Sequence, residues 1–215
     1  MSQFLNIQEN GPIVTLTMNE PETRNALTGN TAADEFVSIC NQIDSNKKIK
    51  AVIITGNGTA FSAGGNLKDM KKMLDDDLSS ELIRESYRQG IQRIPLALYN
   101  LEVPTIAAVN GPAIGAGCDL ACMCDMRIAS HNASFAESFV KIGIIPGDGG
   151  AWFLPRVVGM SKAAEMSFTG DSVDAEEALK IGLISQLTTP ETLLAEANSL
   201  AERISANPSL VLRMT

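Results

Sequence analysis

The chain has 215 residues, of which 45% are hydrophobic, 20% charged and 5% aromatic, so it is long enough for one domain with a substantial core. Its 17 basic and 25 acidic residues give a net charge of -8, which argues against nucleic-acid binding because that needs a concentrated basic face. No apolar run approaches the ~20 residues of a membrane span, and the N-terminus lacks the features of a secretory signal. We therefore expect a cytoplasmic protein that binds neither nucleic acid nor membrane.

The first hundred residues alternate between strand and helix patterns. Two β-branched or apolar runs, 4–7 and 13–18, flank an Asn10-Gly11 turn and predict a β-hairpin. Apolar residues at helical spacing predict a helix over 31–44, and the run 51–55 predicts a short buried strand. The patterns then predict a short helix over 67–74 and a longer one over 80–99, which Pro95 should disturb.

The second half of the chain repeats this alternation. Strands are predicted over 105–109, 126–129 and 183–187, and helices over 118–124, 151–158, 161–168, 175–181 and 190–206. Asp174 with Glu177 forms the capping box that starts the helix over 175–181. Strands that alternate with helices indicate an α/β core, and no linker or fixed-period repeat interrupts it.

The four cysteines predict no metal site. Cys118, Cys122 and Cys124 lie in one apolar stretch without a histidine or a second Cys-x-x-Cys nearby, and Cys40 is isolated. This pattern is typical of small core side chains.

Two segments share a strand, a glycine-rich turn and the start of a helix. They are residues 51–68 and residues 105–119. Glycine lets the backbone approach a ligand closely, and a helix start offers unpaired N–H groups with a partial positive charge. Two such turns that face each other can hold one oxygen as it becomes anionic, which typically lowers a barrier by about 3–4 kcal/mol per donor.

Other interpretations of these turns are weaker. A dinucleotide-binding fingerprint would need a third glycine where Leu120 stands, and a phosphate-binding loop would need Gly-Lys-Ser/Thr. Ordinary strand-to-helix geometry explains either turn alone, but the pair favours an oxyanion site.

Five motifs occur in order along the chain. They are Asn19-Glu-Pro with Arg24-Asn-Ala-Leu27, Phe61-Ser-Ala-Gly-Gly-Asn-Leu-Lys68, Pro104–Gly111 with Gly115-Ala-Gly-Cys-Asp119, Cys124-Asp-Met-Arg127 and Ile145-Pro-Gly-Asp-Gly-Gly150. Together they resemble the crotonase family of enoyl-CoA hydratases and isomerases over nearly the whole chain. The resemblance implies an α/β fold built as a spiral of ββα units, which assembles as a homotrimer or hexamer.

The resemblance also implies how the chain is divided. Residues 1–200 would form the crotonase-like core, and 201–215 the start of the C-terminal helical region. The family usually continues through further helices, so we expect the C-terminal helical part to be truncated.

By the same resemblance, the substrate is an acyl-CoA whose thioester enolate is stabilised, and no cofactor is needed because coenzyme A enters with the substrate. The N–H groups of Gly65 and Ala116 would be the oxyanion donors. Arg24 matches a position near the CoA phosphates, although a solvated surface charge explains Arg24 or Lys68 equally well when each is taken singly. The other substrate-binding residues implied are Ala26, Ala63, Asn66, Leu67, Lys68 and Phe139.

The acids depart from the family pattern. Asp119 stands at the position of the first catalytic glutamate, although an acid in the first turn of a helix is also stabilised by the helix dipole. Phe139 replaces the second glutamate, and Glu137, two residues earlier, should point elsewhere. Asp148 either supplies the lost function or caps the helix that begins near Gly149, and capping is the preferred interpretation.

One carboxylate can remove a proton at one carbon and return it at another, so a Δ3-to-Δ2 enoyl-CoA isomerase fits this pattern better than a standard hydratase. A thioester or C–C hydrolase using the same enolate, and a non-catalytic acyl-CoA-binding relative, are the alternatives. The only histidine, His131, lies in a polar loop and is interpreted as a surface residue.

Overall fold

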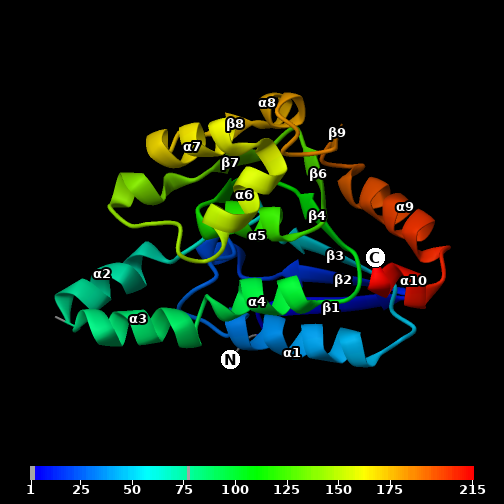
Figure 1. The fold of residues 1–215 in the computed structure, drawn as a ribbon, viewed down its shortest axis with the longest axis horizontal. Helices are drawn as coiled ribbons and strands as arrows, with labels where there is room; N and C mark the ends of the chain where they lie inside the picture. The colour runs from blue at the N-terminus through cyan, green and yellow to red at the C-terminus, as the bar shows by residue number, and fades with distance from the viewer. Residues whose placement is uncertain (1–2, 77) are drawn as a thin grey trace.

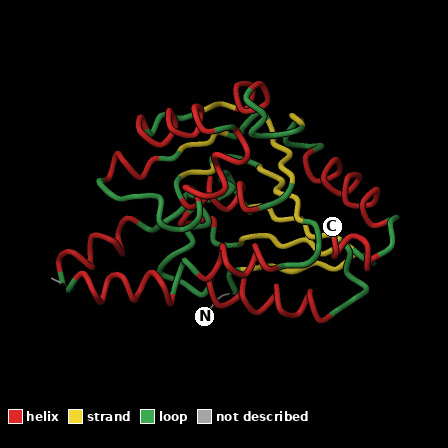
Figure 2. Tube along the Cα trace, viewed as in Figure 1, coloured by secondary structure: helices red, strands yellow, loops and turns green. Residues whose placement is uncertain are grey.

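The computed structural model describes residues 3–76 and 78–215, which fold around two sheets (Figures 1 and 2). The larger sheet has six strands in the order β1-β2-β3-β4-β6-β9, and the smaller has three in the order β5-β7-β8. The strands are β1 Leu5–Asn10, β2 Ile13–Met18, β3 Ala51–Gly56, β4 Thr105–Val109, β5 Ala113–Ile114, β6 Met126–Ser130, β7 Ser134–Ala136, β8 Val173–Asp174 and β9 Gln186–Thr188. The helices are α1 Ala32–Ser45, α2 Leu67–Asp75, α3 Ser80–Gln89, α4 Arg93–Asn100, α5 Ala116–Met123, α6 Gly150–Val158, α7 Met160–Thr169, α8 Ala175–Lys180, α9 Leu193–Ser205 and α10 Ser209–Met214, with 3-10 turns η1 Pro21–Thr23 and η2 Ser138–Ile142.

The larger sheet is parallel except at one edge. β1 and β2 form the predicted antiparallel hairpin, and β2, β3, β4, β6 and β9 then pair in parallel. Parallel neighbours need crossover connections, which the intervening helices supply. Every residue of β4 is buried, as are the first five of β3, so both faces of the sheet are covered.

Alternate strand residues divide the core into two layers. Ile53, Ile106 and Ile128 face α9 and form a small cluster with its buried residues. Val52 and Ile54 point the other way, into the larger cluster that includes residues of α1, α4 and α5. This alternation follows from the two-residue period of a strand. Figure 1 shows α9 on one side of the sheet, while α2 and α3 project together from the other end of the molecule.

Most predicted elements are confirmed, including α1 with its buried stripe of Phe36, Ile39 and Ile43. The predicted helix over 80–99 is wrong in one respect, because the break falls at Gly90 and not at Pro95. Pro95 lies in the first turn of α4, where its missing N–H group would have had no intrahelical partner.

The sequence analysis missed the shortest elements. β5, β7 and β8 were not expected, and the predicted strand over 183–187 is found as β9, Gln186–Thr188. α10 lies within the C-terminal helical region that the resemblance implied. The helix predicted over 190–206 begins only at Leu193. The capping prediction is confirmed for Asp174, whose carboxylate accepts a hydrogen bond of 2.8 Å from Glu177 N.

The four cysteines are free and buried, as the apolar pattern predicted. None of the helices in the described part of the chain combines the length and apolar character that crossing a bilayer requires.

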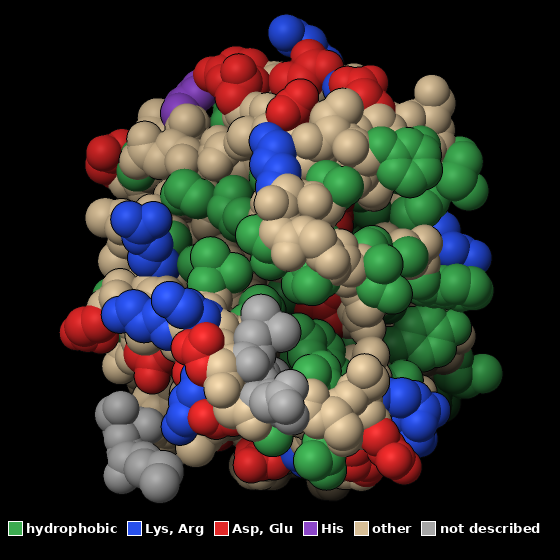
Figure 3. All heavy atoms as spheres, turned by 90° about the vertical axis from the view of Figure 1, so that its left-hand side faces the viewer, with side chains coloured by type: hydrophobic (Ala, Val, Ile, Leu, Met, Phe, Trp, Pro, Cys, Tyr) green, Lys and Arg blue, Asp and Glu red, His purple; other side chains and the backbone are tan. Residues whose placement is uncertain are grey.

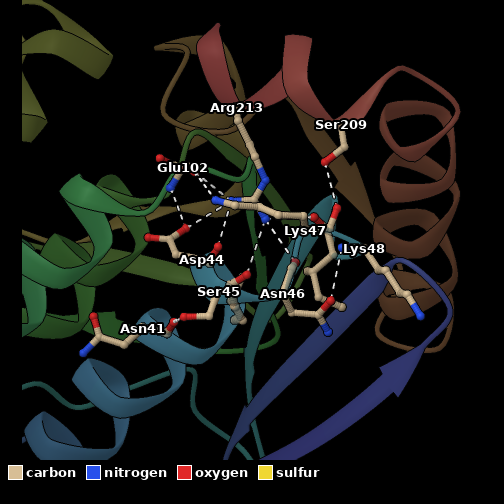
Figure 4. A network of polar contacts seen from close by, with 11 residues as sticks. Asn41, Asp44, Ser45, Asn46, Lys47, Lys48, Glu102, Ser209 and Arg213 are labelled. Carbon is tan, nitrogen blue, oxygen red and sulfur yellow. Dashed lines mark hydrogen bonds and ion pairs between the residues drawn. The ribbon is translucent and has the colours of Figure 1, made fainter.

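A buried arginine fixes the last helix to the first. Arg213 of α10, whose side chain is only 6% exposed, lies 2.9 Å from Glu102 Oε2 and 3.5 Å from Asp44 Oδ1 (Figure 4). Its guanidinium also donates to the backbone carbonyls of Ile43 and Asn46 at the C-terminal end of α1, and to that of Ile49 in the loop that follows. A cation at this end of a helix is favoured by the helix dipole, so Arg213 caps α1 while it holds α10.

We expect Arg213→Ala to lower the free energy of unfolding by about 1–3 kcal/mol, because several carbonyls lose a charged donor at once. Arg213→Lys should cost less, since it keeps the charge but loses the planar fork. Chemical denaturation measures both, with Arg203→Ala on the exposed face of α9 as the matched control. Equal losses for Arg213→Ala and Arg203→Ala would contradict this role.

Candidate active site

The two glycine-rich turns lie against each other. Phe61 N donates to Pro112 O at 3.1 Å, and Ile114 N donates to Ser62 O at 3.0 Å, so the segment after β3 is bonded to the segment after β4. Gly64 has φ 78°, and a Cβ there would lie 2.9 Å from Ala116 N and overlap Ile114 O. Only glycine fits at this contact, since it alone accepts both the dihedral and the distance.

This contact places two backbone donors beside each other. Ala116 is the first residue of α5, where an N–H group has no intrahelical acceptor. Within residues 3–76 and 78–215, neither Ala116 N nor Gly65 N donates a hydrogen bond. The side chain of Met70 lies against Gly65. The two predicted oxyanion donors are therefore both unpaired, on facing turns.

The segment 24–28 runs along the first turn and brings the predicted substrate-binding residues together. Ala63 N donates to Arg24 O at 2.9 Å, and Asn66 N donates to Thr28 Oγ1 at 2.8 Å. Arg24, Leu67 and Lys68 are exposed around this segment, whereas Ala26 is buried in it. The exposed cations are thus positioned at the rim of the turn.

Asn25 is the residue that holds these segments in place. It is fully buried in the left-handed conformation, with φ 56°. Its Nδ2 donates to Ala60 O at 2.9 Å and to Phe61 O at 3.2 Å, and its own carbonyl accepts from Ser62 Oγ at 2.8 Å. The sequence analysis noted Asn25 only within a motif. The sequence signal for this role was an asparagine in a loop, since asparagine tolerates the left-handed conformation and its side chain can bond to the backbone.

Three carboxyl groups meet behind the turns, from segments far apart in the chain. Asp119 of α5, Glu137 after β7 and Asp148 before α6 are 0%, 1% and 5% exposed. The prediction that Glu137 points elsewhere is wrong. β7 pairs with β5 in parallel, and Gly115 N donates to Ala136 O at 2.8 Å, which sets residue 137 beside the start of α5.

The preferred interpretation of Asp148 as a helix cap is also wrong. The N-cap of α6 is Gly149, with φ 120°, and no side chain caps this helix. Gln92 Nε2 donates to Gly147 O at 2.7 Å and fixes the loop that carries Asp148. Asp148 instead lies beside Asp119 and lines a cavity of about 370 Å³.

Gly150 closes the site from behind. A Cβ at this position would overlap Oδ1 of Asp119, so the first turn of α6 packs directly on the carboxyl group. Phe139, at the position where the resemblance places a glutamate, is 8% exposed, and its ring packs near Gly115 at the start of α5.

Two cavities adjoin this region. One of about 410 Å³ lies between segment 27–30 and helices α2 and α3, with Met70 and Tyr87 in its wall. The other, of about 370 Å³, holds Asp148 beside the aromatic residues Tyr99 and Trp152. Figure 3, which views the side from which α2 and α3 project, shows acidic atoms at the floor of a hollow rimmed by hydrophobic side chains.

His131 lies away from this site and is half exposed, with Nδ1 3.1 Å from Glu176 Oε1. The surface interpretation is confirmed, although the partner carboxylate was not foreseen because α8 brings it from 45 residues away.

Comparison with known proteins agrees with this geometry. The family model described as enoyl-CoA hydratase/isomerase matches residues 8–215. The chain belongs to this family. It is 36% identical to the short-chain-enoyl-CoA hydratase of Clostridium acetobutylicum over 97% of this chain and 78% of that protein, and equally to the crotonyl-CoA hydratase of Syntrophomonas wolfei. A solved enoyl-CoA hydratase from Bacillus anthracis superposes with a TM-score of 0.90 at 31% identity, covering 98% of this chain and 80% of that one. The α/β fold of ββα units is confirmed.

In this member of the family, burial and mutual repulsion control the three carboxyls. Burial raises the pKa of Asp119 well above its usual value, and the charges of Glu137 and Asp148 raise it further. Burial also raises the pKa of Glu137 and of Asp148, whereas the neighbouring Asp119 lowers both. As carboxylates all three can only accept hydrogen bonds, and neither oxygen of Asp119 or of Glu137 has a donor in the described structure. A proton on Asp119 would supply a hydrogen-bond donor to this cluster, since a protonated carboxyl can donate to a neighbouring carboxylate oxygen.

We expect Asn25→Ala to lower the thermal midpoint more than Asn25→Gly does. Both variants remove the amide donor that Asn25 gives to the carbonyls of Asn57, Ala60 and Phe61, at a cost of about 1–3 kcal/mol. Alanine adds about 1 kcal/mol because its Cβ is strained at φ 56°. Calorimetry should show a fall of about 2–4 °C per kcal/mol. The exposed Asn132→Ala is the control, and equal midpoints for the alanine and glycine variants would contradict the strain argument.

Proposed function

We propose that this chain is an enoyl-CoA hydratase or Δ3-Δ2 enoyl-CoA isomerase of acyl-CoA metabolism. In this proposal the N–H groups of Gly65 and Ala116 hold the oxygen of a thioester enolate, and Asp119 moves protons. The observation that carries the proposal is that two unpaired donors lie on facing turns, with a buried carboxyl three residues along α5 from one of them. Fixed donors in a site of low polarity stabilise a developing oxyanion more strongly than water does.

Substrate binding would use the rim of the same turn. The protein is acidic overall, with a net charge of -8, so an anionic nucleotide needs local cations. Arg24 and Lys68 are exposed there, and Ala26, Ala63, Asn66 and Leu67 would line the backbone on which the adenine and pantetheine lie. Coenzyme A would enter only as part of the substrate, without a separate cofactor.

Asp148 supports hydration within this proposal. Addition of water to an enoyl thioester needs one group to activate the water and another to protonate Cα. The position of the second family glutamate is Phe139, but Asp148 reaches Asp119 from the loop before α6. Two adjacent carboxyls can divide these tasks, and the similar proteins of Clostridium acetobutylicum and Syntrophomonas wolfei are named as hydratases.

Isomerisation is the second candidate, because a single carboxyl can carry a proton between two carbons of one substrate. Hydrolysis of the thioester or of a C–C bond through the same enolate, and acyl-CoA binding without chemistry, are the outcomes that would replace both. We further propose that the chain works in the cytoplasm as a homotrimer or hexamer, which light scattering would measure.

The product assay tests the reaction class. Wild-type protein is mixed with crotonyl-CoA and with a Δ3-enoyl-CoA, and the products are separated by chromatography. We expect turnover of at least one, and Asp119→Asn should abolish it while acyl-CoA affinity by calorimetry changes little. The variant should also be more stable at neutral pH. Folding raises the pKa of Asp119, so the free energy of unfolding falls as the pH rises above the pKa that Asp119 has in the unfolded chain. Asparagine does not ionise, so the variant does not lose this stability. Release of free thiol alone would favour hydrolysis, and full activity of Asp119→Asn would refute the role of Asp119.

The oxyanion donor at residue 116 can be removed without deleting a side chain. Proline is favoured at the first position of a helix and has no N–H group, so Ala116→Pro should keep α5 while kcat falls about 10²–10³-fold. Met160→Pro is the matched control, because Met160 is also the first residue of a helix after a glycine with positive φ. Circular dichroism checks the fold of both. Equal kcat in the two folded variants would refute the donor role of Ala116.

A further inference from the structure

Glu137 has no part in the proposed proton transfer, yet it is buried against the residues that perform it. Its side chain is 1% exposed, and neither oxygen accepts a hydrogen bond in the described structure. A carboxylate in such a place destabilises the fold, because burying an uncompensated charge is costly, and groups of this kind are typical of functional sites. The task inferred for Glu137 rests on the proposed function, since it concerns the proton that Asp119 would transfer.

The backbone aims Glu137 at Asp119. The parallel pairing of Ile114 with Ala136, together with the bond from Gly115 N to Ala136 O, fixes the chain one residue before Glu137. Asp119 lies between two carboxyls, with Glu137 contributed by the smaller sheet and Asp148 by the loop before α6. Asp119 is therefore the member of the cluster whose pKa both of the other carboxyls raise.

No positive charge offsets this cluster in the part of the chain that the structure describes. From α5 itself the neighbouring groups are the thiols of Cys118 and Cys122, and from α3 it is the phenol of Tyr87, next to Asp148. The arginines of the adjoining helices α4 and α6 are engaged elsewhere, Arg93 with Asp34 and Arg156 over the ring of Trp152. The neighbours of Asp119 are thus neutral or negative.

We propose that Glu137 is a positioning residue that keeps a proton on Asp119, so that Asp119 enters the reaction as the acid and Asp148 as the base. Asp148 suits the base role because its carboxyl lines the cavity of about 370 Å³. Glu137 acts only through its charge and its acceptor oxygens, without touching the substrate.

The proton balance of hydration is complete with these groups. Asp148 takes one proton from water while the oxygen bonds to Cβ, and the electron pair of the double bond moves to give the thioester enolate. Asp119 then gives its proton to Cα as the enolate collapses. The proton now on Asp148 then passes to the neighbouring Asp119, which restores the starting state without an external donor.

Infrared titration of the free protein tests the proposal without any substrate. A protonated carboxyl absorbs apart from a carboxylate, and the band of Asp119 is identified as the one that Asp119→Asn removes. We expect this band in the wild type to persist to higher pH than in Glu137→Gln, because glutamine keeps the shape and removes the charge. Glu137→Asp keeps the charge and should restore the titration at least in part. It also keeps the test open if the glutamine variant does not fold.

The pH profile of kcat/KM is the second measurement. The alkaline limb reports loss of the proton from Asp119, so Glu137→Gln should move that limb to lower pH, with about tenfold lower kcat/KM above the limb for each unit moved. Glu202→Gln, exposed on α9, is the control and should leave the profile unchanged. A residue with a structural role alone would lower activity equally at every pH.

The outcomes separate this inference from the function on which it rests. An Asp119 band that titrates identically in wild type and Glu137→Gln overturns the inference, even where the wild type turns over enoyl-CoA. A wild type without turnover of either enoyl-CoA refutes the proposed function, while the infrared titration still decides whether Glu137 holds the proton.

Discussion

The close approach of the two glycine-rich turns is the constraint on which the rest of the site depends. Gly64 lies so near Ile114 O and Ala116 N that a side chain cannot be placed there. The contact fixes the start of α5, and with it the direction of the unpaired Ala116 N–H group and the position of Asp119 one turn later. Asn25 maintains the contact, because its buried amide bonds to the strand-to-helix loop from the opposite side.

The second consequence of that contact is an unfavourable one. The start of α5 faces β7 and the loop before α6, so three carboxyls are enclosed together without a cation among the described residues. Folding is opposed by the desolvation and repulsion of these groups, and the opposition grows as the pH rises and they ionise. Stored unfavourable energy of this kind is typical of groups that transfer protons, since it raises their pKa toward the working pH. The large core around α1, α4 and α5, with Arg213 capping α1, supplies the stability that tolerates it.

Helices and strands that carry a sustained apolar pattern were predictable, because that pattern lies within the segment itself. The buried stripe of α1 is of this kind, as is the fully buried β4. The break in the helix over 80–99 was placed at Pro95, whereas Gly90 makes it. Proline is tolerated in a first turn, and only the register of α4 against its neighbours shows that Pro95 occupies one. β5 and β7 are two and three residues long and carry no pattern of their own, since their pairing with each other defines them.

The sequence by itself determined the paired glycine turns and the family to which their motifs point, and the resemblance to that family is the basis on which Gly65 and Ala116 are proposed as donors. These depend on residues close in the chain, where backbone freedom and helix starts are local properties. Only the tertiary structure decided the acids. Glu137 and Asp148 are 18 and 29 residues from Asp119 (137 − 119 and 148 − 119), and a carboxyl shows in sequence neither its burial nor its neighbours. Their meeting follows from the pairing of β5 with β7 and from the loop that Gln92 fixes, which are contacts between segments that no local pattern encodes.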